Sequence, residues 1–290
     1  MTLIQTIIIS IVEGLTEALP ISSTGHMIIT QHLLGVPQND MFVHSFTFII
    51  QFAAILSVVL LYWKRFFRLN TSPAPEGSNA LQILLHKFRF YWLLVVGVIP
   101  MVIIGFAAKK SGLLDWLLDS VWVVAVMLVV GGVFMLFCDK LFNSKDNEKN
   151  EVDEHRAFKI GLFQCLSVIP GVSRSMATIV GGMASGLSRK RSAEFSFFLA
   201  VPTMAGATLL HVLDLLDLLN KGDATWATGH NVFLLLVGCA VSFVVALFAM
   251  KWFVSFLTKY GFKAFGWYRI IVGGIILIML LSGASLNMIG

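Results

Sequence analysis

Charged residues are scarce in this chain of 290 residues: Asp, Glu, Lys and Arg make up 13%, against about 25% in soluble domains. That scarcity excludes an ordinary soluble enzyme, and the 57% hydrophobic content excludes a disordered chain. Basic residues outnumber acidic ones, 21 to 16, but they fall in short clusters between apolar runs. Membrane topology explains such clusters better than nucleic-acid binding does, so we expect no nucleic-acid partner.

Cysteine is scarce too, with only Cys138, Cys165 and Cys239 in the chain. Their odd number and their spacing fit neither a disulfide framework nor a zinc site, so we interpret them as apolar packing residues. No Lys or Arg precedes the N-terminal apolar run, and Glu13 and Glu17 interrupt it. This pattern does not indicate a signal peptide.

Six apolar runs are each long enough to cross a bilayer as a helix. They cover residues 42–63, 90–108, 119–138, 193–213, 232–257 and 266–286. Two further apolar segments, 2–35 and 157–187, are each interrupted by proline and a polar string. Irregular backbone at membrane depth is tolerated only inside protein or beside a wet cavity, so we expect two re-entrant helical hairpins. The predicted fold is an all-α integral membrane protein.

The two interrupted segments resemble each other. Glu13-Gly14-Leu15-Thr16 aligns with Gln164-Cys165-Leu166-Ser167, and after a one-residue gap Pro20-Ile21-Ser22-Ser23 aligns with Pro170-Gly171-Val172-Ser173. Each half then holds one hairpin and three spans, and because three is odd the second half enters the membrane from the opposite side. This predicts an inverted-topology repeat whose site lies near the midplane between the halves. The predicted parts are a first repeat (1–142), a cytoplasmic linker (143–156) and a second repeat (157–290).

The distribution of positive charge predicts the orientation, because cytoplasmic loops of membrane proteins are rich in Lys and Arg. If residues 64–89 are cytoplasmic, 17 of the 21 basic residues, Arg269 among them, fall on cytoplasmic segments. Only Lys109, Lys110 and Lys221 fall outside, and Arg174 lies within the second hairpin. This places both termini outside and inserts the first hairpin from the outer face.

Charges inside apolar segments are costly and mark function by default. Glu13 and Glu17 are four residues apart, so a helix places both carboxylates on one face. Two anions on one face need a divalent cation or a basic partner, and their oxygens suit Mg²⁺ or Ca²⁺. A structural polar pair inside a helix bundle is the alternative, and we favour the functional interpretation.

The polar residues Ser22-Ser23-Thr24-Gly25-His26 of the first interrupted segment supply groups for phosphoryl chemistry. Ser23 is a candidate nucleophile or phosphate ligand, and Thr24 is a candidate phosphate-binding hydroxyl. His26 is a candidate acid or base near neutral pH.

The second interrupted segment adds a cation within Gly171-Val172-Ser173-Arg174-Ser175. Arg174 is the only basic residue of this string, and the planar guanidinium matches phosphate geometry. The remaining candidates for phosphate binding are the polar residues around it: Gln164, Ser173, Ser175 and Thr178. A purely structural ion pair between Arg174 and Glu17 or Glu194 is the alternative. Two carboxylates, a His, an Arg and several hydroxyls within the membrane suit phosphoryl chemistry on a lipid-borne substrate.

These strings carry a specific resemblance. Glu13-Gly14-Leu15-Thr16-Glu17 followed by Leu19-Pro20-Ile21-Ser22-Ser23-Thr24-Gly25-His26 resembles the first signature of the undecaprenyl-pyrophosphate phosphatase family, the bacitracin-resistance membrane phosphatases. Pro170-Gly171-Val172-Ser173-Arg174-Ser175 with Thr178 resembles the second. The likeness extends over essentially the whole chain. It departs at Met176, where the family often has Gly, and at Ala18, where an aromatic residue is common.

The resemblance implies a bacterial inner-membrane enzyme with its site towards the outer face. Such an enzyme hydrolyses undecaprenyl diphosphate to the monophosphate and inorganic phosphate, which recycles the carrier lipid for peptidoglycan and confers bacitracin resistance. It also implies a divalent cation, Mg²⁺ or Ca²⁺, and Glu13 and Glu17 would hold this metal or polarise water. Ser23 would be nucleophile or phosphate anchor, His26 the acid or base, and Arg174 the diphosphate clamp. Whether serine or water attacks phosphorus stays open, and so does a homodimer.

Three other functions fit parts of the sequence. A polyprenyl-phosphate flippase would use the same inverted-repeat site. An intramembrane serine protease would use Ser23 and His26, but it would leave Arg174 without a role. A structural membrane scaffold would need none of these groups for chemistry.

Overall fold

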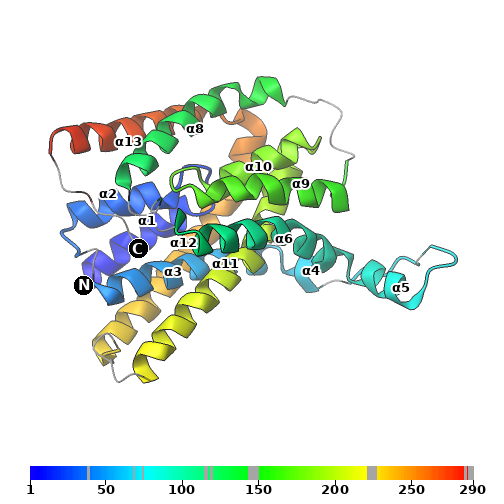
Figure 1. The fold of residues 1–290 in the computed structure, drawn as a ribbon, viewed down its shortest axis with the longest axis horizontal. Helices are drawn as coiled ribbons and strands as arrows, with labels where there is room; N and C mark the ends of the chain where they lie inside the picture. Colours follow the sequence, from blue (N-terminus) through cyan, green and yellow to red (C-terminus); the bar gives the residue numbers. More distant parts are fainter. Residues whose placement is uncertain are drawn as a thin grey trace.

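The computed structural model describes residues 1–37, 40–67, 69–73, 75–113, 117, 120–142, 150–220, 227–283 and 286. Within these residues the chain is helical and contains no strand, so the predicted all-α class is confirmed (Figure 1). The elements are α1 (Leu3–Thr16), α2 (Ser23–Leu33), α3 (Met41–Leu61), α4 (Trp63–Phe67), α5 (Ala80–Lys87), α6 (Arg89–Lys110), α8 (Val121–Leu141), α9 (Glu154–Gln164), the 3₁₀ turn η1 (Cys165–Val168), α10 (Arg174–Ala184), α11 (Arg189–Asn220), α12 (Gly229–Tyr260) and α13 (Lys263–Leu281). Residues 143–149 of the predicted linker and Lys221 lie outside the described residues.

Six of the described helices are long and apolar enough to cross a membrane. They are α3, α6, α8, residues Arg189–Leu213 of α11, α12 and α13. Each overlaps one of the six apolar runs, so this prediction is confirmed. The protein is a multi-pass membrane protein.

The other described α-helices are too short to span a bilayer. The longest, α1, has 14 residues, which at 1.5 Å per residue is about 21 Å against a hydrocarbon core of about 30 Å. α1 contacts α2, and α9 contacts α10, across breaks at residues 17–22 and 165–173. The helix–break–helix pattern is therefore present in both segments, while their re-entrant insertion stays a prediction.

The two breaks share an unusual backbone geometry. Ser22 (φ 67°) and Ser173 (φ 74°) are the only residues other than glycine with positive φ in the described chain, and each directly precedes a helix. Three of the four helix boundaries also repeat with an offset of 151 positions: α1 and α9 start at 3 and 154, α2 and α10 start at 23 and 174, and these two end at 33 and 184. The ends of α1 and α9, at 16 and 164, differ by 148. The one-residue gap in the sequence alignment is therefore wrong. Ser22 corresponds to Ser173, and Ser23 corresponds to Arg174.

Helices of the first predicted repeat pack against helices of the second. α1 packs along α12, and α9 packs along α6, where a Cβ on Gly161 would lie only 2.3 Å from the Gly97 carbonyl oxygen. α8 and α13 form a separate pair along the top edge of the view in Figure 1. Ala18 from the first break, Val172 from the second and Met176 from α10 lie in one buried apolar cluster. This packing brings the two breaks together at the centre of the molecule.

Candidate active site

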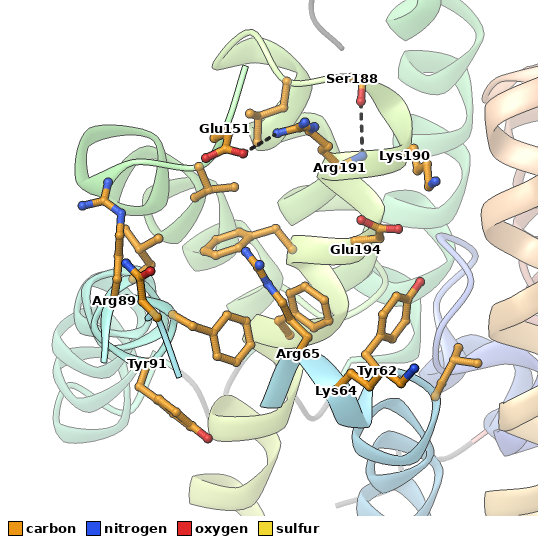
Figure 2. A pocket seen from close by; sticks show the side chains of 18 of the residues that line it. Tyr62, Lys64, Arg65, Arg89, Tyr91, Glu151, Ser188, Lys190, Arg191 and Glu194 are labelled. Atoms are coloured by element: carbon orange, nitrogen blue, oxygen red, sulfur yellow. Dashed lines mark hydrogen bonds and ion pairs between the residues drawn. The ribbon is translucent and has the colours of Figure 1, made fainter. Parts of the chain in front are cut away.

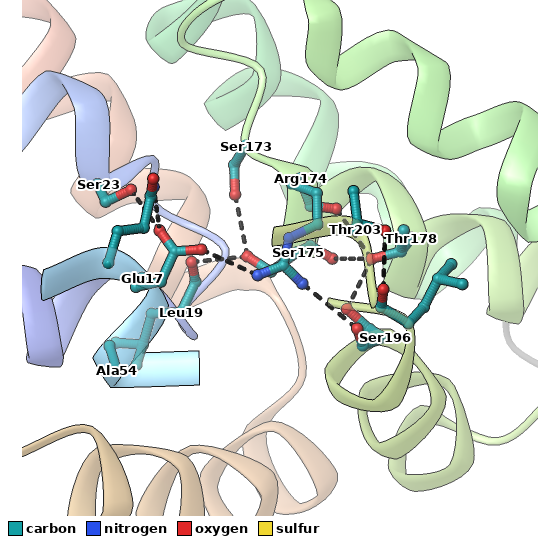
Figure 3. A network of polar contacts seen from close by, with 12 residues as sticks. Glu17, Leu19, Ser23, Ala54, Ser173, Arg174, Ser175, Thr178, Ser196 and Thr203 are labelled. Carbon is teal, nitrogen blue, oxygen red and sulfur yellow. Dashed lines mark hydrogen bonds and ion pairs between the residues drawn. The ribbon is translucent and has the colours of Figure 1, made fainter. Parts of the chain in front are cut away.

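Glu17 lies at the junction of the two breaks, as Figure 3 shows. It is the C-cap residue of α1 and is 7% exposed. Its Oε1 accepts a hydrogen bond from Arg174 Nη2 at 3.0 Å. Its Oε2 accepts one from Ser23 Oγ at 2.7 Å and one from Gln51 Nε2 at 3.0 Å. A single carboxylate thus connects the starts of α2 and α10 to the middle of α3.

Arg174 begins α10 and uses only part of its guanidinium for this contact. Nη1 donates to the Ser196 carbonyl oxygen at 3.3 Å. Nε is buried and has no hydrogen-bond partner. A buried N–H without an acceptor is unfavourable, so this edge of the guanidinium is suited to an incoming anion.

Hydroxyl groups at the end of the second break and in the first turns of α10 hold Arg174 in place. Ser175 Oγ donates to the Leu19 carbonyl oxygen at 2.8 Å, which ties the second break to the first. Ser173 Oγ lies 3.0 Å from Ser175 Oγ. Thr178 Oγ1 donates to the Arg174 carbonyl oxygen at 2.9 Å and therefore braces the first turn of α10. These three predicted residues therefore fix the backbone from which the Arg174 side chain extends.

Glu13 lies one turn before Glu17 and is 1% exposed. It is in electrostatic contact with Glu17, and its Oε1 has no hydrogen-bond partner. Gln164, 151 positions later, is fully buried, and both atoms of its amide lack a partner. Buried polar atoms normally find a partner, so each of these groups is available to a ligand.

Glu13 and Glu17 are the two carboxylates of this cluster that could hold a metal. Among the described residues no group of three or more His, Cys, Asp and Glu side chains could hold a metal ion. Glu13 and Glu17 are two carboxylates, and Mg²⁺ is commonly bound by one or two carboxylates completed by water and substrate phosphates. The unpartnered oxygen of Glu13 fits such a site.

The imidazole of His26 makes its hydrogen bonds away from this cluster. Nδ1 lies 2.8 Å from the Ser22 carbonyl oxygen, and Nε2 lies 2.7 Å from the Tyr268 hydroxyl. Because a carbonyl can only accept, Nδ1 carries the proton, and in the neutral ring Nε2 accepts from Tyr268. The ring also stacks on Tyr268. Thr24 lies half-buried on the same helix.

Arg269 holds both breaks at once. It is fully buried in α13 and donates to the carbonyl oxygens of Pro20 at 3.1 Å, Gly171 at 2.7 Å and Val172 at 3.0 Å. Two carbonyls of α8 accept its remaining bonds. Its assignment to the cytoplasmic charge excess was wrong, because a buried guanidinium that binds backbone carbonyls is not part of a cytoplasmic loop.

Sequence reasoning missed four residues that shape the site: Gln51, Ser196, Tyr268 and Arg269. A signal was present for two of them, because Gln51 and Arg269 are polar groups inside predicted spanning runs, the criterion that found Glu13. Ser196 lies in the run Glu194-Phe195-Ser196-Phe197, which also resembles the family, but its role at the site does not follow from that likeness. Nothing in the sequence distinguishes Tyr268 from other polar residues of the helices.

The fold and the site define a multi-pass membrane protein in which two broken helix pairs build one buried site of carboxylates, hydroxyls and a guanidinium. The family model described as "Bacitracin resistance protein BacA" matches residues 6–275, and the chain belongs to this family.

Individual relatives are similar over nearly their whole length. A protein of Porphyromonas gingivalis is 53% identical over 287 residues, 99% of each chain. One of Bdellovibrio bacteriovorus is 44% identical over 292 residues, 100% of each chain. One of Aquifex aeolicus is 41% identical over 277 residues, 94% of this chain and 96% of its own. All three are named undecaprenyl-diphosphatase.

Proposed function

We propose that this chain is an undecaprenyl-diphosphate phosphatase. It hydrolyses the lipid diphosphate to undecaprenyl phosphate and inorganic phosphate, recycles the carrier lipid for peptidoglycan synthesis and confers resistance to bacitracin. Membership of the BacA family and the names of its relatives support the reaction. The observation that carries the proposal is that Arg174 and Ser23, which begin helices at corresponding positions, both bind the carboxylate of Glu17.

The charges of the site favour a divalent cation as a further component. With all three side chains ionised, Glu13, Glu17 and Arg174 sum to one negative charge. A diphosphate would be repelled by such a site unless positive charge were added. We propose Mg²⁺ or Ca²⁺ between Glu13 and Glu17, where it would neutralise phosphate charge. The unpartnered oxygen of Glu13 supports this position.

The protein's own groups then have distinct roles. The free edge of Arg174 binds the terminal phosphate and stabilises charge on its oxygens during transfer. Ser23 Oγ already donates to Glu17, so this carboxylate can accept the proton when Oγ attacks the terminal phosphorus. The bond to the bridging oxygen breaks, and undecaprenyl phosphate leaves. Water then cleaves the phosphoserine to inorganic phosphate.

Direct attack by water is the other route, with Ser23 as phosphate anchor and Glu17 as base. His26 is placed to move a proton at Nε2, through Tyr268. Thr24, Gln164, Ser173, Ser175 and Thr178 complete the proposed phosphate-binding set. An acid quench during single turnover, followed by a search for phosphate on Ser23, distinguishes the two routes.

We further propose that the protein resides in the bacterial inner membrane, with both termini outside and the site towards the outer face. The bias of Lys and Arg supports this orientation, with 16 of 21 basic residues on predicted cytoplasmic segments once Arg269 is removed from the 17. The matching helix starts and the positive φ at Ser22 and Ser173 support the repeat, and the odd number of spans in each half supports its inversion.

Release of inorganic phosphate from undecaprenyl diphosphate by the purified protein in detergent tests the proposal. We expect release that stops with a chelator and returns with Mg²⁺ or Ca²⁺. No release from folded protein under any metal condition would contradict the phosphatase function. Lipid movement across vesicles without release would favour the flippase, and chelator-insensitive peptide cleavage would favour the protease.

A further inference from the structure

A second, strongly basic cavity lies away from the active site. It has a volume of about 1330 Å³ and is formed where α3 ends and where α6 and α11 begin (Figure 2). Seven Lys and Arg side chains line it against two acidic ones, Glu151 and Glu194. A cavity with a formal surplus of five positive charges attracts anions.

Several of these cations have no strong partner. In the described part of the chain, Lys64, Arg65 and Lys190 form no ion pair within 4.0 Å. Arg191 lies 3.7 Å from Glu151, whose side chain is 85% exposed. Exposed ion pairs of this kind contribute little, so they leave the cations available to a ligand.

Aromatic rings form one wall of the cavity. The Phe198 ring packs edge-on against Tyr62 at 5.1 Å and against Phe90 at 5.2 Å between centroids. The guanidinium of Arg65 lies over Phe90, 5.5 Å from the ring centroid. A cation held against an aromatic face keeps its outer N–H groups free for an acceptor.

The cavity lies at the end of a membrane span, and this position indicates the source of its ligand. α3 is a membrane span that ends at Leu61, and the next residues, Tyr62 and Trp63, line the cavity. Trp63 is 58% exposed. Aromatic residues with basic neighbours at the end of a span are typical of the lipid headgroup level. A ligand with a phosphate group and an apolar chain would match both the cations and the aromatic wall.

The cavity is separate from the active site. Gln51, which binds Glu17, and Tyr62, which lines the cavity, lie on one helix eleven residues apart, or about 16 Å at 1.5 Å per residue. A neighbouring hollow of about 490 Å³ shares Tyr62, Lys190 and Glu194 and adds Lys251 and Lys259 from α12. The positive surface therefore continues away from the active site.

We infer that this cavity is a second binding site, for the phosphate group of a membrane lipid or for free phosphate. Arg65, Lys190 and Arg191 bind the phosphate, and the aromatic wall contacts the first carbons of a lipid chain. All three cations act electrostatically on Glu194, which offsets their mutual repulsion in the absence of a ligand. This inference does not depend on the phosphatase reaction.

Photo-crosslinking of the purified full-length protein tests it. The probe is dodecyl phosphate carrying a diazirine near the phosphate, and labelled peptides are located by mass spectrometry. We expect labelling within residues 61–71 and 87–93, reduced about tenfold in Arg65→Gln/Lys190→Gln, since charged hydrogen bonds to phosphate are lost. The matched control Lys109→Gln/Lys110→Gln removes two exposed lysines at the other end of α6 and leaves labelling unchanged.

Glu194→Gln should change the labelling in the opposite direction. An increase in labelling cannot result from a variant that fails to fold. Removing the competing carboxylate should increase labelling of the same peptides. If unlabelled dodecyl phosphate displaces the probe but the same concentration of inorganic phosphate does not, the ligand is a lipid. If both displace the probe equally, the ligand is free phosphate. Labelling confined to peptides of the active site, or unchanged in both Arg65→Gln/Lys190→Gln and Glu194→Gln, would overturn the inference.

Discussion

Arg174 Nη2 and Glu17 Oε1 lie 3.0 Å apart although 157 positions separate them in the chain. Both side chains are buried, at 11% and 5% exposure. The pair connects the two broken helix segments at the point where Ser23 also binds Glu17. An ion pair this well buried needs both members, because removal of one leaves an uncompensated charge.

Arg174→Ala should therefore damage both stability and activity. We expect a loss of about 3–5 kcal/mol in unfolding free energy, from the buried carboxylate left behind, and about a hundredfold loss of phosphate release. The double variant Glu17→Gln/Arg174→Gln should recover most of the stability but none of the activity. Thermal unfolding in detergent and phosphate release measure the two effects, and an active double variant would refute the role of the pair.

Ser23→Ala should affect activity far more than stability. Glu17 keeps its bonds to Arg174 and Gln51, so we expect about 1 kcal/mol of destabilisation but at least about a hundredfold slower phosphate release. Ser45→Ala is a matched control, because Ser45 Oγ donates only to the Met41 carbonyl within α3. Equal activities of the two variants would exclude Ser23 from the reaction.

Gly131→Ala should disturb the site through Arg269. A Cβ at position 131 would lie 2.5 Å from Arg269 Nη2 and would displace the guanidinium from the carbonyls of both breaks. We expect about 1–3 kcal/mol of destabilisation and reduced activity. The control is Gly274→Ala on α13, where a Cβ meets nothing within 4 Å. If the two variants have the same unfolding free energy and the same activity, Arg269 does not hold the two breaks in place.

Glu13→Gln tests the proposed metal position. A buried carboxylate with one oxygen lacking a hydrogen-bond partner is costly, so a neutral isostere should keep or raise the stability of the protein. The Mg²⁺ concentration for half-maximal phosphate release should rise about tenfold or more. An unchanged metal dependence would exclude Glu13 as a ligand.

The spans and most site residues could be predicted from the sequence because the bilayer enforces simple rules. Six runs had the required length and apolarity, and the rule that buried charge is costly identified Glu13, Glu17 and Arg174. The same rule also points to Gln51 and Arg269, which lie inside the predicted runs 42–63 and 266–286. Arg269 lies near the start of the predicted run 266–286, where a basic residue is typical of a loop end, whereas α13 begins six residues before it, at Lys263.

Contacts between distant segments could not be predicted in this way. Gln51 reaches Glu17 only because α3 packs against α1, and Ser196 reaches Arg174 only because α11 packs against α10. The alignment of the two halves failed for a related reason. It matched the prolines, whereas the backbone geometry that repeats is the positive φ at Ser22 and Ser173.

The central claim is that Ser23 and the Glu17–Arg174 pair form one site on corresponding helix starts. The most direct test is phosphate release from undecaprenyl diphosphate by four purified, folded proteins: wild type, Ser23→Ala, Glu17→Gln/Arg174→Gln and the triple variant. Groups that act as one unit are strongly non-additive, so the triple variant should be no more than about threefold slower than the slower of the other two. Losses that multiply in the triple variant, or a neutralised pair that keeps wild-type release, would contradict the claim.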